Sequence, residues 1–345
     1  MLTFLEQAGF FVWELFKFMT FFYVVWAPGF LISGLITCRY RRSAWNAVTG
    51  QSKGGYKGVI QAIGLGIVGS SGREASLNAT LDLLEGGVSP SRAFAFLIAS
   101  RNMTIHFWSI FALSLGAEFA TGQILGALVM IGIVSFGLRC LDIEDVEKPV
   151  GKEPEGNLAI ELPAFSSWRS VLISVTGWQS VLRFTGREIV RFTPSLAVGI
   201  ILGGLILASG LRPWWPRFAD LFGHATVISD LTNALVAPFL SSIASLSPVG
   251  NLPVIHALFK TDGLGYAGII SFCLASSIHP NDIKAYSKVF GPKKTVVLIG
   301  LLYGAAVMGG LGSTWAYATF GFRPSLPPVK LASKIFKALL TFFGF

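Results

Sequence analysis

Two polar stretches, one in each half of the chain, carry the residues best suited to hold a small polar solute or an ion. The first runs from Gly69 to Thr104 and the second from Ser245 to Asp282, and both interrupt apolar sequence with Ser, Gly, Pro and Asn. Backbone groups without helical partners are costly in hydrocarbon, so such breaks persist only where protein or a water-filled cavity receives them. Their N–H and C=O groups, together with small hydroxyls, can replace part of a hydration shell.

We expect the breaks of the two halves to face one another near the middle of a membrane and to form one site. Pro280 prevents a helix from continuing through Ser277, and Asn281 or Asp282 can cap the helix that follows. The alternative is that Ser and Gly at these positions serve close helix packing. The candidate substrate-binding residues are Ser70, Ser71, Gly72, Asn78, Ser100, Arg101, Asn102, Ser247, Pro248, Asn251, His256, Ser276, Ser277, Pro280, Asn281 and Asp282.

Arg101 is the most informative single residue, because it directly follows the apolar run Ala93–Ala99 and Ser100. A charge at such a place is expensive and is usually paired or functional. Its candidate partners are Glu74, Asp82 and Asp282. The alternative is that the helix ends at the membrane interface and the guanidinium reaches the lipid headgroups.

Other side chains that could do chemistry form no recognisable motif. His256, His279, Cys273 and Met103 include soft ligands for a metal or metalloid, and a histidine could also carry protons. Their spacing matches no metal site, so buried core residues are the simpler interpretation. The four histidines form no HExxH motif. We therefore expect neither an enzyme nor a bound cofactor or metal.

The composition indicates that these residues are positioned by membrane helices. Hydrophobic residues make up 52% of the 345 residues, the mean hydropathy is +0.64, and charged residues are only 13%. We predict an all-α polytopic membrane protein with about eight apolar segments and with broken or re-entrant helices. The segments are 10–36, 54–70, 93–115, 119–138, 195–211, 226–246, 265–277 continuing past a break to 290, and 295–320.

The chain divides into two similar halves. Sliding the second half over the first by 176 positions matches Ser71 with Ser247, Gly87 with Gly263 and Phe96 with Phe272. The order of long helices, breaks and Gly-rich helices also repeats, a recurrent plan of secondary transporters. The predicted parts are a first transmembrane repeat (1–140), an acidic linker (141–167), an amphipathic helix on the membrane surface (168–193), a second repeat (194–322) and a basic amphipathic tail (323–345). An ordinary connecting helix is the alternative for 168–193.

Basic residues indicate that the two repeats are inverted. The loop after the first helix holds Arg39, Arg41, Arg42, Lys53 and Lys57, whereas its counterpart in the second half is poor in basic residues. The lysines between 284 and 294 show the opposite bias. Because basic loops stay inside, equivalent loops lie on opposite faces. The basic tail, which this places outside, runs against the rule. The net charge of the chain is +9, and its basic residues cluster beside apolar segments. This placement favours contact with lipid over contact with nucleic acid.

The chain resembles the predicted-permease family that includes the ArsP organoarsenical efflux permeases. The residues that carry the likeness are Leu84-(x)2-Gly87-(x)5-Ala93-(x)2-Phe96-Leu97-Ile98-Ala99-Ser100, Gly250-Asn251-Leu252-Pro253, Gly263, Phe272-(x)2-Ala275-Ser276 and Tyr286-Ser287-Lys288-Val289-Phe290-Gly291. The resemblance implies a multi-pass permease of the cytoplasmic membrane that exports a small solute, trivalent organoarsenicals in the named members. Many relatives have C-x-C-G and a proline at the first break, where this chain has Ser70-Ser71-Gly72-Arg73. Arsenic cannot be captured by a thiol there, and a hydroxyl site prefers a harder solute.

We therefore predict a membrane permease that moves a small solute, such as a metalloid, an organoarsenical or another small anion or ion, by alternating access at the paired breaks. Its partners are that solute and membrane lipid, with no nucleic acid, and a homo-oligomer is compatible with the sequence. An ATP-binding loop is not evident, so an ion gradient or a partner subunit would drive transport. A noncatalytic membrane subunit or anchor and an ion channel are the alternatives, since channels and carriers both need polar backbone at the midplane.

Overall fold

The computed structural model describes residues 3–49, 55–69, 72–141, 165, 167–212, 214 and 227–321, and every regular element in these ranges is helical. Ser70, Ser71, most of the acidic linker and the basic tail lie outside the described residues. The helices are α1 (Phe4–Thr49), α2 (Tyr56–Ile67), α3 (Arg73–Glu85), α4 (Pro90–Asn102), α5 (Ile105–Leu115), α6 (Ala117–Cys140), α8 (Trp168–Leu172), α9 (Val175–Gly210), α10 (Val227–Ala244), α11 (Asn251–Lys260), α12 (Tyr266–Leu274), a 3-10 turn (Ala275–Ser277) and α13 (Pro280–Thr319).

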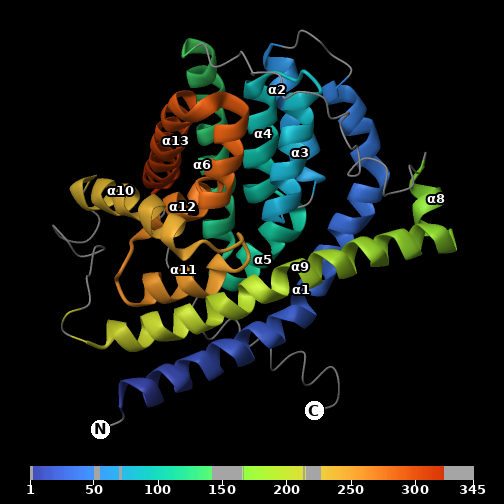
Figure 1. Ribbon diagram of the computed structural model, residues 1–345. Coiled ribbons are helices and arrows are strands. Elements are labelled where there is room, and N and C mark those ends of the chain that lie inside the picture. Colours follow the sequence, from blue (N-terminus) through green and yellow to red (C-terminus); the bar gives the residue numbers. More distant parts are fainter. Residues whose placement is uncertain are drawn as a thin grey trace.

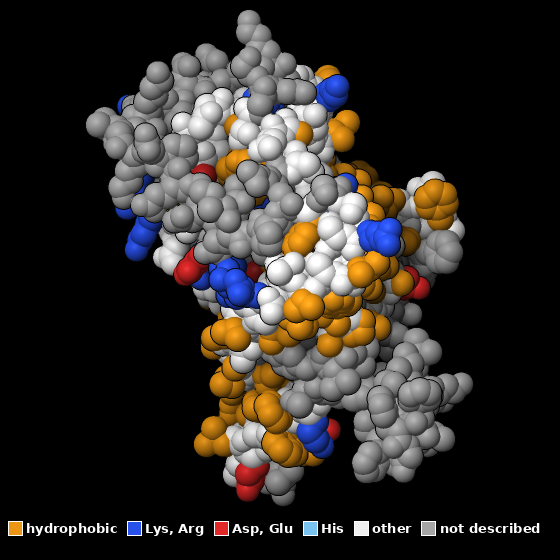
Figure 2. Space-filling view, turned by 90° about the vertical axis from the view of Figure 1, so that its right-hand side faces the viewer, with side chains coloured by type: hydrophobic (Ala, Val, Ile, Leu, Met, Phe, Trp, Pro, Cys, Tyr) orange, Lys and Arg blue, Asp and Glu red, His pale blue; other side chains and the backbone are white. Residues whose placement is uncertain are grey.

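Four of the described helices are long and apolar enough to cross a membrane, namely α6, α9, α10 and α13, and shorter apolar helices occupy 105–115 and 266–277. Helix α10 has an apolar outer surface that matches a lipid environment. It exposes a stripe of large apolar side chains at Ile228, Leu231, Leu235, Phe239 and Ile243. Hydrophobic side chains cover much of the described surface in Figure 2 as well. Surfaces of this kind are unfavourable in water and favourable in lipid. The all-helical class is thus confirmed for the described residues, with four helices of membrane-spanning length and two shorter apolar ones where eight apolar segments were predicted.

Both predicted breaks interrupt helices where the sequence indicates. The apolar run 93–115 is two helices, because α4 ends at Asn102 and α5 begins at Ile105. In the second half, the 3-10 turn ends at Ser277 and α13 begins at Pro280, in the first turn, where a helix tolerates proline. Two glycines with positive φ make further breaks: Gly116 before α6 (φ 108°) and Gly291 inside α13 (φ 74°). Only glycine adopts such angles without strain.

Each of these helix boundaries in the first half has an equivalent 175 residues later in the second half. This offset is one residue shorter than the 176 positions that best match the residue types of the two halves. The equivalent pairs are Asn102 and Ser277 at helix ends, Ile105 and Pro280 at helix starts, Gly116 and Gly291 at the positive-φ breaks, and the C-terminal hydrogen bonds Val88 N to Leu83 O and Gly263 N to Leu258 O. Helix geometry therefore repeats more regularly than residue identity.

The stretch 168–193, expected as a separate surface helix, is not one element. Helix α8 covers its start, and α9 then continues through Pro194 to Gly210 without a boundary at Thr193. Its buried positions, which include Phe184, Glu188 and Phe192, recur every fourth residue. This spacing gives α9 an inward face that packs on the rest of the protein, which explains the difference from the expected free-lying helix.

Helices α1 and α9 lie side by side along the lower part of Figure 1 and run in opposite directions. Near the start of α1, Gln7 Oε1 accepts a hydrogen bond from Arg212 Nη2, just beyond the end of α9, at 2.9 Å. Farther along α1, the carbonyl oxygen of Phe30 accepts one from Thr185 Oγ1, in the first part of α9, at 3.3 Å. The long first helices of the two halves are therefore antiparallel.

Helices α6 and α13 form a second antiparallel pair, visible together at the upper left of Figure 1. Tyr317 OH, near the end of α13, donates to the carbonyl oxygen of Glu118, at the start of α6, at 2.8 Å. At the other end of α6, Gly137 faces the side chain of Leu301. Of the elements that adjoin the breaks, α4 and α12 pack on α6, α11 packs on α9, and α3 packs on α4.

Candidate functional site

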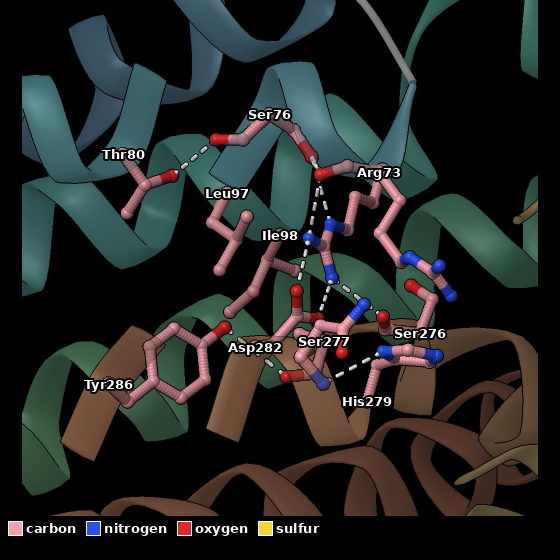
Figure 3. Close-up of polar contacts among 12 residues, drawn as sticks. Arg73, Ser76, Thr80, Leu97, Ile98, Ser276, Ser277, His279, Asp282 and Tyr286 are labelled. Atoms are coloured by element: carbon pink, nitrogen blue, oxygen red, sulfur yellow. Dashed lines mark hydrogen bonds and ion pairs between the residues drawn. The ribbon is translucent and has the colours of Figure 1, made fainter. Parts of the chain in front are cut away.

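Arg101 joins the breaks of the two halves in a buried charge cluster, which consists of Arg101, Asp282, Ser76, Arg73 and Ser276. The Arg101 guanidinium contacts both carboxylate oxygens of Asp282, at 2.6 and 3.3 Å, and both side chains are 0% exposed. It also donates to Ser76 Oγ at 2.9 Å, to the Arg73 carbonyl at 3.0 Å and to the Ser276 carbonyl at 2.6 Å. Figure 3 shows Ser76 and Arg73 from α3 on one side and Asp282 from α13 on the other.

Arg101 and Asp282 are both positioned by helix ends. Arg101 lies in the last turn of α4, where the helix dipole favours a cation, and Asp282 lies in the first turn of α13, where it favours an anion. Of the three candidate partners, Glu74, Asp82 and Asp282, Arg101 therefore pairs with Asp282. A guanidinium that is 0% exposed does not reach lipid headgroups, so that alternative is wrong.

The other polar residues of the breaks fall into two groups. In the first half they are hydrogen-bonded within the helices: Ser100 Oγ donates to the Leu97 carbonyl, and Asn102 Nδ2 donates to the Ile98 carbonyl. In the second half, three buried oxygens have no hydrogen-bond partner among the described residues, namely Asn251 Oδ1, Ser276 Oγ and Ser277 Oγ. Buried groups of this kind usually meet water or a ligand.

A cavity of about 750 Å³ adjoins the charge cluster. It is lined by the first turn of α3, the middle of α9, the segment after α10 and Arg41 of α1. Its lining includes the expected site residues Gly72, Asn78 and Ser247. We call it the arginine cavity, because the described residues of its lining include Arg41, Arg73, Arg187 and Arg191, together with the two acidic residues Glu74 and Glu188.

Glu188 is the buried acid of the arginine cavity. It is 1% exposed, and its Oε1 accepts a hydrogen bond from Arg191 Nη1 at 3.2 Å. Behind it, His106 Nε2 lies 3.9 Å from Glu188 Oε2, and His106 Nδ1 is 2.8 Å from Ser33 Oγ. On the opposite wall, Arg73 Nη1 donates to the Ser245 carbonyl at 2.8 Å. Lys, Arg, Asp and Glu side chains gather together at mid-height in Figure 2.

The remaining candidates lie outside the arginine cavity. His256 lies on α11 and Pro248 in the buried turn before it, whereas Pro280 and Asn281 are exposed in the first turn of α13. His279 caps that helix, since its Nδ1 accepts from Asn281 N at 3.0 Å. Among the described residues, no three His, Cys, Asp or Glu side chains gather as a metal site.

The sequence did not point to the α9 wall of the arginine cavity or to His106. The predicted surface helix 168–193 contains Arg183, Arg187 and Arg191, which a membrane surface would place among lipid headgroups. Glu188 was the available signal, because a lone acid amid three arginines on an otherwise apolar helix indicates a polar enclosure more than a lipid surface.

Apolar helices with exposed apolar stripes, interrupted around a buried ion pair, define a multi-pass membrane protein with a polar interior. The family model ArsP_1, described as a predicted permease, matches residues 12–315, so the chain belongs to this family. It is also similar to Putative permease Rv2963 of Mycobacterium tuberculosis, with 25% identity over 278 residues, 77% of this chain and 68% of that protein. No solved structure matches the chain. Membership implies a transported small-molecule substrate.

Proposed function

We propose that the protein moves a small hydrophilic solute across the membrane by alternating access between two inverted halves. The solute enters the arginine cavity and passes the second break beside Asn251, Ser276 and Ser277. The charge cluster holds the two halves together around this path. The observation that carries the proposal is the meeting of both breaks at Arg101, with a solute-sized cavity beside them.

The helix directions support the inverted arrangement. Repeats related by an axis in the membrane plane place equivalent helices in opposite directions. The first long helices, α1 and α9, and the last ones, α6 and the second part of α13, are antiparallel pairs. The constant spacing of the helix boundaries supports duplication independently of residue identity.

The lining favours a hydrophilic solute over thiol-bound arsenic. The described residues around the arginine cavity include arginines, glutamates, Asn78 and serines but no cysteine. Soft metalloids prefer thiolate ligands, whereas hydroxyls, amides and guanidinium groups suit oxygen-rich solutes. Export, the direction known in the organoarsenical permeases, is part of the proposal for this chain.

The test uses the full chain in proteoliposomes, with labelled inorganic phosphate and phenylarsine oxide as separate probes. Ser277→Ala removes a buried hydroxyl without a partner among the described residues, so we expect unchanged or slightly higher thermal stability but slower transport. Ser100→Ala is the matched control, because that hydroxyl already bonds within its helix. Equal transport by wild type and Ser277→Ala contradicts the path. Uptake of labelled solute that is driven by unlabelled solute inside the vesicles (counterflow) indicates a carrier, and its absence indicates a channel.

A further inference from the structure

We infer that the arginine cavity binds its solute as a small oxyanion, a carboxylate or a phosphate, through Arg73, Arg187 and Arg191, with Glu188 as the carboxylate that the solute displaces from Arg191. The inference rests on the proposed function only in taking this cavity as the entry site. It adds the chemical class of the solute, which neither the family nor the fold specifies.

The arginines converge on the cavity from different elements. Arg187 and Arg191 are one turn apart on α9 and therefore point to the same side of that helix, while Arg73 begins α3 and Arg41 comes from α1. A guanidinium presents paired N–H groups that match the two oxygens of a carboxylate or phosphate. Four guanidinium groups around 750 Å³ form a binding site for such a group more than for a neutral or cationic solute.

The charge balance of the lining points the same way. Among the described residues of the lining, four arginines face two glutamates, and Glu74 is exposed. The first turn of α3, from Gly72 to Ala75, also lines the cavity, and the N-terminal end of a helix adds favourable potential for an anion.

Glu188 indicates how an anion would bind. Its Oε1 accepts a hydrogen bond from Arg191 Nη1 at 3.2 Å, and the Arg191 side chain lines the cavity and is 49% exposed. A carboxylate therefore already fits this guanidinium, and the exposed part of Arg191 can receive another one. A solute oxyanion that takes over Arg191 would leave Glu188 facing His106, 3.9 Å away.

The experiment measures equilibrium binding of labelled inorganic phosphate to the purified full chain in neutral detergent. We compare wild type with Arg187→Gln, Arg191→Gln and Glu188→Gln. Arg183→Gln is the matched control, because Arg183 is exposed on the same helix, one turn earlier, and does not line the cavity. Because a hydrogen bond to a charged group contributes more than one power of ten in affinity, we expect about tenfold weaker binding for each cavity variant. Arg183→Gln should bind like wild type, and Glu188→Gln more tightly.

A second measurement identifies the source of the oxyanion. Nanodiscs of phosphatidylcholine, with and without phosphatidylglycerol, are compared for phosphate binding. Phosphate binding that phosphatidylglycerol leaves unchanged assigns the site to a free solute. Phosphate displaced by phosphatidylglycerol in wild type, with binding of that lipid lost in Arg191→Gln, assigns it to a lipid headgroup. Both results support the oxyanion class.

Two results overturn the inference. One is the absence of saturable binding of either phosphate or phosphatidylglycerol by wild type, and the other is binding that Arg187→Gln and Arg191→Gln leave unchanged. A protein that transports an uncharged probe without binding either anion overturns the oxyanion class and leaves the proposed transport standing. Anion binding without any transport supports the oxyanion class and overturns the proposed transport.

Discussion

The charge cluster and the arginine cavity each contain an arginine paired with a carboxylate, but in opposite surroundings. Arg101 and Asp282 are both 0% exposed, and the guanidinium has three further oxygen acceptors. Arg191 is 49% exposed and contacts Glu188 at a single distance of 3.2 Å. Arg101 is therefore held from several sides, whereas Arg191 can exchange its partner.

The contrast teaches which pair holds the protein together and which can take part in recognition. Removing one partner of a fully buried pair leaves an uncompensated charge, at a cost of about 3–5 kcal/mol. Pairs with an exposed member contribute roughly 0–1 kcal/mol, because water solvates the charge that remains. The charge cluster thus fixes the halves against each other, and the arginine cavity keeps its charges available for a ligand.

Asp282→Asn should have the largest effect on stability. It leaves the Arg101 charge buried without a counter-ion, so we expect a loss of about 3–5 kcal/mol of folding stability. The measurement is the thermal unfolding midpoint of the detergent-purified protein, with the monodisperse fraction by size exclusion. Asn281→Ala, next in the chain but exposed, is the control. An unfolding midpoint equal to that of wild type would show that the charge cluster does not hold the halves together.

Gly199→Ala should have an intermediate effect and tests how the cavity wall is fastened to the second break. A Cβ at Gly199 of α9 would clash with the Gly250 carbonyl oxygen, and beside it Ser195 Oγ accepts from Ser247 N at 2.8 Å. Overpacking at such a contact costs about 1–3 kcal/mol. Gly132→Ala is the control, since nothing lies within 4 Å of a Cβ there.

For Gly199→Ala, the expected result is a lower unfolding midpoint together with weaker phosphate binding, because α9 carries Arg187 and Arg191. Gly132→Ala should be neutral or more stable by roughly 0.5–1 kcal/mol, because alanine is the better helix former. A Gly199→Ala protein with normal stability and binding would mean that α9 moves freely over the second break.

The sequence predicted the helical class and the breaks because both depend on local composition. Apolar runs of membrane length and Pro280 after Ser277 determine them with little help from tertiary contacts. Arg101 was recognisable for the same reason, since a charge after an apolar run needs a partner. The choice of Asp282 over Glu74 and Asp82 was beyond the sequence, because α3, α4 and α13 meet only in the folded protein.

The arginine cavity could not be predicted, because its residues come from four separate parts of the chain. The helical period of the α9 arginines shows that they share a face, but lipid headgroups and a protein cavity are equally compatible with that face. In the folded protein Glu188 is buried beside His106 of α5, while Arg187 and Arg191 are exposed, and this decides between them. Whether the expected site residues bind a solute stays a prediction.

Glu188→Gln should have the smallest effect on stability, within about 1 kcal/mol, because exposed Arg191 stays solvated and the amide oxygen can still accept its hydrogen bond. Its unfolding midpoint is measured beside that of Glu74→Gln, which removes the exposed acid of the same lining. Both variants should stay close to wild type, while Glu188→Gln alone gains phosphate affinity. A loss of stability as large as that of Asp282→Asn would place Glu188, with His106 behind it, in the fixed core and leave no exchangeable carboxylate in the arginine cavity.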